Sequence, residues 1–301
     1  MSEPDQPPTP DRLAALLKEG DHQETAAYLD RLGAADAETR KRALRPIRDI
    51  AEESSCSFED LAGPLSTFLT DEDRAVRLTT AKLFVTLAQS DSAAVLPVVA
   101  TLADRLVDDE EFYYFRARCA EALGYTAVDS PEEVTDLETL ADLRIGLSFD
   151  ESEVKEKLAK ALAYVALGDP GWLRHQVDSL AEDLTDENEL VQYHLCVAFV
   201  VVGCVHPKKL ADADDVHRGR QPDENPYVQG WAVEALGLLA KSDVPVESTH
   251  YLEHINADGE ETPSFLNDRL QFYPGRLVDE LSRSTSAPSS WIERRQTPWL
   301  R

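Results

Sequence analysis

The feature that most constrains the fold is a pattern that returns six times along the 301 residues at a nearly constant interval. Each copy has an acidic loop, an apolar or aromatic residue, usually a basic or amide residue, and then a helix rich in Ala and Leu. We take the basic or amide residue as position 0, and in the six copies it is Arg40, Arg77, Arg116, Lys155, Gln192 and Gln229. The intervals between these residues are 37, 39, 39, 37 and 37. A repeat of this length indicates an array of helical hairpins.

Apolar residues within each copy follow a helical period. They recur three, four and seven residues after position 0, as in Ala43, Leu44 and Ile47 of the first copy. This spacing places them on one face of a helix with 3.6 residues per turn. The acidic residues before each helix favour its N-terminus by capping and through the helix dipole. We therefore predict that these three positions form the core in all six copies.

The pattern V-R-x-x-A-x-x-A-L-G after an acidic turn resembles the HEAT repeat, in the short form related to phycobilisome-lyase repeats. Val76–Arg77, Ala120–Gly124 and Val233–Gly237 carry the resemblance best. The first copy departs from it most, with Pro46 where the other copies have Leu or Ala. The resemblance covers residues 21–245 and implies a right-handed superhelix of stacked hairpins. It also implies that the basic residue at position 0 binds acidic loop groups of its own or the adjacent repeat.

We accordingly predict an all-α fold, an α-solenoid of about six HEAT-like helical hairpins over residues 11–245. Residues 1–10 are expected to be disordered, residues 246–283 to form a helical C-terminal cap, and residues 284–301 to form a Ser-rich linker and a Trp- and Arg-rich tail. Residues 11–32 should form two short helices that complete the first hairpin. The partner helices are expected at Phe58–Leu69, Ala93–Val107, Pro131–Leu147, Trp172–Leu184 and Pro207–Val216.

The charge balance is strongly acidic. Asp and Glu number 57 against 30 Lys and Arg, which gives a net charge of −27. This composition resembles that of proteins from salt-loving archaea, in which self-repulsion is screened because the Debye length falls to about 3 Å in molar salt. Two interpretations remain open: the acidity reflects a saline habitat, or it serves to bind a basic partner.

Positions two, five and nine residues after position 0 point away from the buried face of each helix. In the first four copies they carry six basic and two acidic residues, against the trend of the whole chain. The family resemblance implies that these helices line the concave surface. We predict that this inner-face stripe binds a partner through Arg42, Arg45, Lys82, Arg118, Tyr125, Lys157, Lys160, Tyr164 and Trp231. It suits an acidic peptide, an acidic protein loop or a nucleic-acid backbone, and the alternative is that its bases only offset neighbouring acids.

The last two copies place apolar residues at the same positions, including Val197, Val201 and Leu238. Contiguous exposed apolar groups are rare, so something should cover them. The tail is the candidate, because its last eleven residues hold two Trp and three Arg with one acid. We predict that it docks, on its own chain or on another, through Trp291, Arg294, Arg295 and Trp299. The alternative is a disordered tail.

Signatures of enzymes and metal sites are weak. His250, Glu253 and His254 spell H-x-x-E-H, the inverted zinc-protease motif, but the flanking chain does not provide the large α/β domain of such proteases. A second group, His194, Cys196, Cys204 and His206, falls within and beside an apolar helical run, where Cys behaves as a small hydrophobe. We predict no catalytic residues, no metal site and no cofactor.

The sequence therefore favours a non-enzymatic, protein-binding scaffold or adaptor, with signalling or taxis as one concrete setting. A cytoplasmic location is expected, because the four Cys lack C-x-x-C spacing, the N-terminus is polar, and the longest apolar run, Leu195–Val205, is too short to span a bilayer. One alternative is a lyase-like or enzyme-accessory protein that handles a cofactor. Another is nucleic-acid binding, which is disfavoured because the stripe is weakly basic and phosphate contacts weaken further in high salt.

Overall fold

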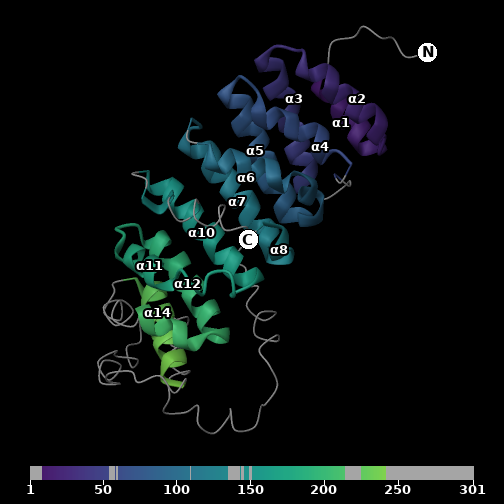
Figure 1. Ribbon diagram of the computed structural model, residues 1–301. Helices are drawn as coiled ribbons and strands as arrows, with labels where there is room; N and C mark the ends of the chain where they lie inside the picture. The colour runs from purple at the N-terminus through teal and green to yellow at the C-terminus, as the bar shows by residue number, and fades with distance from the viewer. Residues whose placement is uncertain are drawn as a thin grey trace, which may run out of the picture. The chain divides into compact units, whose positions relative to one another are not determined.

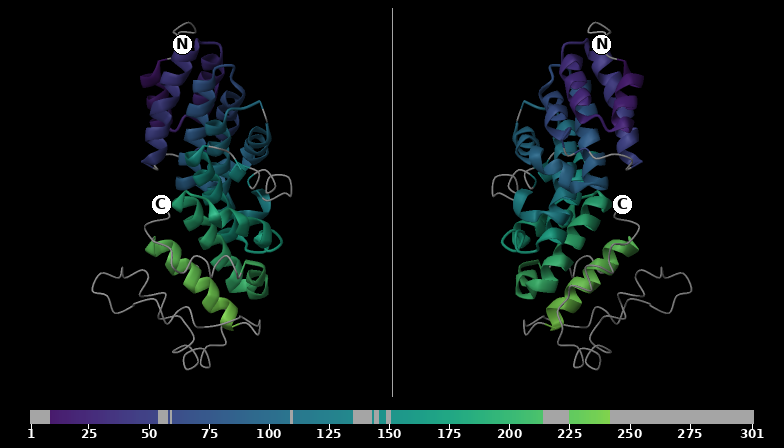
Figure 2. Two further views of the ribbon diagram at one scale, coloured as in Figure 1. Left: turned by 90° about the vertical axis from the view of Figure 1, so that its left-hand side faces the viewer. Right: turned by 90° about the vertical axis from the view of Figure 1, so that its right-hand side faces the viewer.

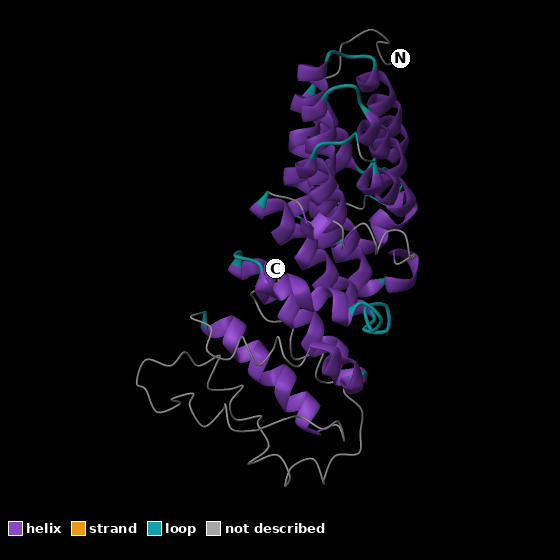
Figure 3. Ribbon diagram, turned by 60° about the vertical axis from the view of Figure 1, so that its left-hand side comes forward, coloured by secondary structure: helices purple, strands orange, loops and turns teal. Residues whose placement is uncertain are grey.

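The computed structural model describes residues 9–53, 58, 60–108, 110–134, 143, 146–148, 151–213 and 225–241. Within these ranges every regular element is a helix (Figure 3). The chain divides into two compact units, residues 1–161 and 162–301, and the division falls within helix α10. The all-α prediction is confirmed.

Six long helices each begin three residues before a predicted position-0 residue. Each holds one copy of the repeated pattern, and in the first unit α3, α5 and α7 pack side by side in chain order (Figure 1). The six helices are α3 (Ala37–Glu52), α5 (Arg74–Ser90), α7 (Tyr113–Asp129), α10 (Ser152–Gly168), α12 (Glu189–Val205) and α14 (Pro226–Lys241). The two short N-terminal helices are also present, as α1 (Pro10–Glu19) and α2 (His22–Gly33).

The partner helices are shorter and more broken than predicted. The predicted spans Phe58–Leu69, Ala93–Val107 and Trp172–Leu184 contain short α- or 3₁₀-helical segments in place of one continuous helix (Figure 2). Pro97 lacks the backbone N–H that an α-helix needs, and the segment around it is 3₁₀. The segments are α4 (Ala62–Ser66), η1 (Thr67–Thr70), η2 (Ser92–Val98), α6 (Val99–Val107), α8 (Pro131–Val134), η3 (Gly146–Ser148), α11 (Val177–Ala181), η4 (Glu182–Thr185) and η5 (Pro207–Ala213).

The core lies where the periodicity predicts it. At the positions three, four and seven residues after position 0, every side chain of known burial is at most 1% exposed. The two largest are Phe84 and Phe199. Cys119 and Cys196 occupy this face as free, buried thiols, and burial raises the pKa of Cys119 far above that of an ordinary thiol. These helices therefore owe their stability mainly to an apolar face that stacking buries.

Capping by acidic residues is found at α3 and α5 and capping by an amide at α12, whereas Phe112, the N-cap residue of α7, provides no side-chain cap. Asp36 accepts a hydrogen bond from the Thr39 backbone N–H at 3.0 Å, and Asp73 accepts from Ala75 N–H at 2.8 Å. Asn188 does the same for Leu190 at 2.9 Å. The hydroxyl and N–H of Thr39 lower the pKa of Asp36, because both donate to its charged form.

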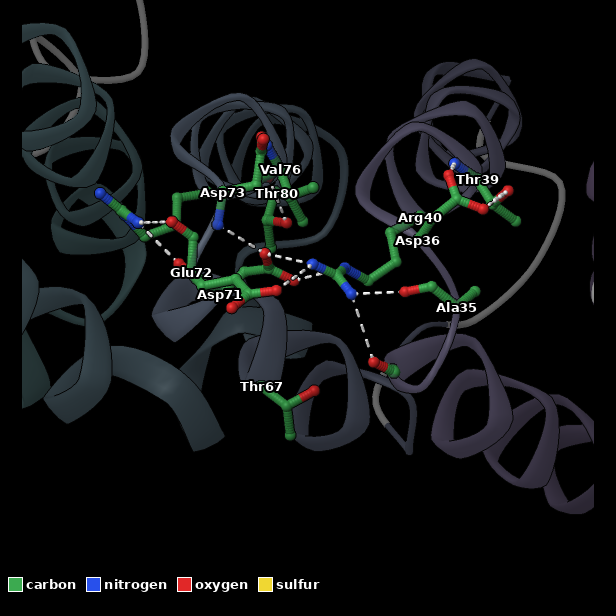
Figure 4. A network of polar contacts seen from close by, with 12 residues as sticks. Ala35, Asp36, Thr39, Arg40, Thr67, Asp71, Glu72, Asp73, Val76 and Thr80 are labelled. Atoms are coloured by element: carbon green, nitrogen blue, oxygen red, sulfur yellow. Dashed lines mark hydrogen bonds and ion pairs between the residues drawn. The ribbon is translucent and has the colours of Figure 1, made fainter.

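Arg40 and Arg77, at position 0 of the first two copies, tie their helices to loops, as the family resemblance implies. Arg40 donates to the backbone carbonyl of Ala35 in its own loop and binds the Asp71 carboxylate of the next hairpin through Nη2 at 2.9 Å (Figure 4). Arg77 repeats the arrangement: its Nη1 donates to the Asp71 carbonyl at 2.6 Å, and its Nε lies 2.9 Å from Glu111.

Glutamine at position 0 keeps only half of this arrangement. Gln192 donates to the backbone carbonyl of Asp186 at 2.6 Å. Arg77 makes the equivalent bond to the carbonyl of Asp71, three copies earlier in the chain. A neutral amide reproduces the tie to its own loop, but it cannot supply the ion pair to a following acid.

Neighbouring helices approach closely at one glycine. A methyl group added to Gly124 of α7 would lie 2.7 Å from the Cα atom of Ala161 in α10. Only a residue without a side chain allows this approach. The small side chain of Ala161 on the facing helix leaves room for it. Small residues on both helices therefore allow α7 and α10 to approach closely at this contact.

Several sequence predictions fall outside the described residues. These are the disordered segment before Thr9, the C-terminal cap, the tail, and the H-x-x-E-H motif. Among the described helices, none combines the length and the apolar character needed to cross a membrane.

Candidate functional site

The N-terminal part of the inner-face stripe carries three exposed cations. Arg42 and Arg45 lie on α3, and Lys82 lies on α5 at the position equivalent to Arg45. Within the described part of the chain, none of the three has a carboxylate within 4.0 Å. Arg42 and Arg45 do add, after Lys41, to the attraction that lowers the pKa of Glu38. Their charges are therefore open to a ligand.

The next part of the stripe is built around one buried carboxylate. Glu121 of α7 is 4% exposed, and its Oε2 accepts a hydrogen bond from Arg118 Nη1 at 2.6 Å. On its other oxygen, Lys160 Nζ lies at 3.4 Å and Lys157 Nζ at 4.0 Å. Three cations of the predicted stripe thus share a single acid that α7 places among them. A buried charge is tolerated only with this kind of pairing.

Tyr125 extends this cluster by one helical turn. Lys160 Nζ donates to the Tyr125 hydroxyl at 2.7 Å, and the ammonium lies 4.8 Å from the centre of the same ring. The tyrosine therefore holds the lysine through both a hydrogen bond and a cation–π contact. This arrangement fixes Lys160 toward Glu121 and away from solvent.

Two more acids complete the balance of charge. Arg118 Nη2 lies 3.4 Å from Glu153, and Lys157 Nζ lies 3.0 Å from Glu156. With Glu121, three carboxylates match the three cations of α7 and α10. For these residues the structure supports the alternative stated above, in which bases offset neighbouring acids. The unpaired positive charge of the stripe is confined to α3 and α5.

Two stripe residues are buried, although the helical geometry predicts that they point to solvent. Tyr164 is 2% exposed and Trp231 is 6% exposed, and Val197, also expected at the surface, is 3% exposed. The prediction treated each helix alone. Long side chains one repeat apart in fact contact one another, as Lys160 and Glu121 do across 39 residues. A position that faces away from the core of its own hairpin can therefore be covered by a neighbouring hairpin, as Trp231 is by the ring of Tyr193.

An aromatic group in the second unit includes residues that the stripe does not contain. The ring of Tyr193 on α12 lies 6.3 Å from Trp231 and 6.4 Å from Tyr227, both on α14, in edge-to-face geometry. Tyr227 is 43% exposed and Leu190, at the start of α12, is 49% exposed. Trp231 is thus the buried floor of this group, and Tyr227 and Leu190 are its exposed rim.

Sequence reasoning missed Glu121, Tyr193, Tyr227 and Leu190 as site residues. A signal for two of them was present: Leu190 and Tyr227 both lie two residues before position 0, as does Tyr114, which is also exposed. The predicted stripe contains only positions that follow position 0, so it omits these residues. The role of Glu121 depends on contacts between helices, which the pattern of a single helix does not reveal.

The described residues offer no site for metal chemistry. No three His, Cys, Asp or Glu side chains among them are grouped so that they could hold an ion. In particular, Cys196 is a core residue in α12, whereas Cys204 near the end of the same helix is half-buried. The His194, Cys196, Cys204 and His206 group is therefore not assembled as a ligand set.

Comparisons with known proteins agree with the fold. The sequence matches no protein-family model, and no curated protein is found as a relative by sequence. Among solved structures, an engineered protein aligns with 87% of this chain and 72% of its own at a TM-score of 0.64 and 20% identity. A designed armadillo repeat protein in complex with the peptide (KR)4 aligns with 78% of this chain and 100% of its own, at 0.55 and 17%. UNC-45 from Drosophila melanogaster aligns with 87% of this chain and 37% of its own, at 0.58 and 13%.

At these identities the likeness shows the fold alone. The chain is a helical repeat protein of the α-solenoid class, built from armadillo- or HEAT-like hairpins. Such scaffolds bind partners along the extended concave surface that their stacked hairpins form. A function must therefore be argued from the surfaces of this chain.

Proposed function

We propose that this protein is a non-enzymatic scaffold that binds an acidic segment of a partner protein through Arg42, Arg45 and Lys82. The observation that carries the proposal is that these three exposed cations have no carboxylate partner among the described residues, in a chain whose net charge is −27. The other basic side chains of the stripe are paired with Glu121, Glu153 and Glu156.

The placement of the three cations supports recognition of an extended segment. Arg45 and Lys82 occupy the same position in consecutive copies, 37 residues apart, on helices that pack side by side. Arg42 lies one helical turn before Arg45. Charges repeated along adjacent helices match side chains repeated along an extended chain, and arginine can bind a carboxylate through two parallel hydrogen bonds.

The structural neighbours support binding of a peptide by this class of scaffold, since one designed armadillo protein was solved with a peptide bound. Its peptide, (KR)4, is basic. Here the exposed charges on α3 and α5 are basic themselves, so we infer a ligand of opposite sign. The strong acidity elsewhere disfavours binding of an acidic segment at the other surfaces of this chain.

Site-specific photo-crosslinking tests the proposal. A photo-reactive amino acid replaces Thr79, which lies on the stripe of α5, or Thr67, which is exposed in the partner-helix layer. We expect the Thr79 position to crosslink a discrete protein in native lysate and the Thr67 position not to do so. Equal crosslinking from both positions, or from Thr67 alone, would place the binding surface elsewhere. Crosslinking to nucleic acid from Thr79 would contradict a protein ligand.

A further inference from the structure

The exposed aromatic rim of the second unit is held in a fixed position. The Asn225 side chain accepts the Tyr227 backbone N–H at 2.9 Å, which caps the start of α14. The same side chain donates to Glu189 at the start of α12 at 2.6 Å. One asparagine therefore sets the position of Tyr227 relative to α12. A surface that is already ordered loses little entropy when it binds a ligand.

The sequence around this rim is mainly acidic, although η5, which packs against α12 and α14, contains Lys208 and Lys209. Residues 175–207 include six Asp or Glu and no Lys or Arg, and the first fifteen residues of α14 include one Glu and no Lys or Arg. Glu187 and Glu189, which precede Leu190 in the sequence, are exposed. Aromatic rings beside carboxylates form the usual environment in which a protein binds a guanidinium group.

One segment of the chain has the matching chemistry. Residues 291–301, WIERRQTPWLR, contain three Arg, one Glu and two Trp, so the segment carries a net charge of +2 in a protein of −27. Its arginines suit the carboxylates and rings of the rim, and its tryptophans suit Leu190 and Tyr227. Tryptophan and arginine are the residues that most often dominate binding energy at interfaces.

We propose that residues 291–301 dock within the same molecule on the surface formed by Leu190, Tyr193 and Tyr227. Arg294 and Arg295 lie against the tyrosine rings and Glu187, and Trp291 or Trp299 covers Leu190. The 49 residues from 242 to 290 give ample reach, since a chain extends about 3.3 Å per residue. The surface belongs to the second unit and shares no residue with the α3 and α5 cations, so this proposal stands or falls independently of the proposed function.

Fluorine NMR of the full chain tests the docking. The protein contains four Trp, at 172, 231, 291 and 299, and 5-fluorotryptophan resonances can be assigned with one Trp→Phe variant for each. In the wild type we expect at least one of the Trp291 and Trp299 resonances to differ from that of the free fluorinated peptide 291–301. Tyr227→Ala should return it to the peptide value. Tyr113→Ala should leave it in place, because Tyr113 is equally exposed at 43% but lies on α7 of the first unit.

A second variant keeps the test valid if Tyr227→Ala disturbs α14. Arg294→Glu with Arg295→Glu changes no residue of the repeats and should also return the resonance to the peptide value. The docking is refuted if both tail resonances match the free peptide in the wild type. It is equally refuted if the Arg→Glu pair has no effect, or if Tyr113→Ala acts as strongly as Tyr227→Ala. A resonance that moves with protein concentration would assign the tail to a second copy and overturn the intramolecular proposal.

Discussion

Arg40 binds Asp71, the acid that opens the next hairpin, through Nε at 2.7 Å and Nη2 at 2.9 Å, and both side chains are 8% exposed. Arg77 binds Glu111 in the same way across 34 residues. Each pair joins the helix of one repeat to the loop of the following repeat. In the first unit, two ion pairs between successive repeats therefore add to the stability that the apolar core provides.

Removing Arg40 should destabilise the first unit. Arg40→Ala leaves the Asp71 carboxylate buried without its cation, which typically costs about 3–5 kcal/mol. Arg12→Ala is the control, because Arg12 pairs with Glu24 at 2.9 Å while 46% exposed, and such pairs contribute about 1 kcal/mol or less. Urea unfolding followed by circular dichroism measures both. Equal losses of stability would show that the buried pair does not join the repeats.

The close approach at Gly124 predicts a steric penalty. Gly124→Ala would place a methyl group 2.7 Å from the Ala161 backbone, and overpacking of this kind costs about 1–3 kcal/mol. Gly33→Ala is the matched control, since a methyl group there meets no atom within 4 Å. That change should be neutral or stabilising by up to about 1 kcal/mol. The account of the α7–α10 contact fails if the two variants have the same midpoint of thermal unfolding.

Neutralising Glu121 should release the cations around it. Glu121→Gln removes the negative charge that three cations share and replaces one of its two acceptor oxygens with a donor, so it should cost about 1.5–3 kcal/mol of stability. Glu132→Gln, at an exposed position on α8, should change stability by about 0.5 kcal/mol or less. The free energy of unfolding from denaturant titration separates the two. An undiminished value for Glu121→Gln would mean that the three cations do not need their shared acid.

Tyr28 predicts a loss of stability at alkaline pH. Burial raises the pKa of Tyr28 to about 12 from 10.0, and its hydroxyl donates to the Thr9 carbonyl at 2.5 Å. Because the folded-state pKa lies above the unfolded one, the neutral phenol stabilises the fold fully below pH 10, and this contribution is lost as the pH rises from 10 toward 12. The difference in unfolding free energy between wild type and Tyr28→Phe should shrink over that window. A constant difference would contradict the burial of Tyr28.

The fold could be predicted because its information is local and repeated. Leu44, Phe84 and Leu123 lie on the same buried face of the helix in the first three copies. Arg40 and Arg77 precede this face at position 0 of their copies. The core positions follow from this repetition, and the ties of the basic residue to loop acids follow from the resemblance to the HEAT repeat.

The candidate site was less predictable because it depends on contacts between repeats. Whether Lys160 is open to a ligand is decided by Glu121 and Tyr125, which lie 39 and 35 residues away. Trp231 is covered in the same way, with the ring of Tyr193 beside it. The period of a single helix shows which way a side chain points, but not what the neighbouring helix places there.

The affinity of the crosslinked partner tests the central claim most directly. We compare the wild type with Arg42→Glu, Arg45→Glu and Lys82→Glu combined, and with a control that reverses three exposed cations elsewhere: Lys18→Glu, Arg31→Glu and Lys208→Glu. Both triple variants change the net charge equally, so general repulsion is matched. We predict that the stripe variant loses about tenfold or more in affinity, equivalent to about 1.4 kcal/mol, and that the control loses far less. Equal dissociation constants for the two triple variants would contradict binding through α3 and α5.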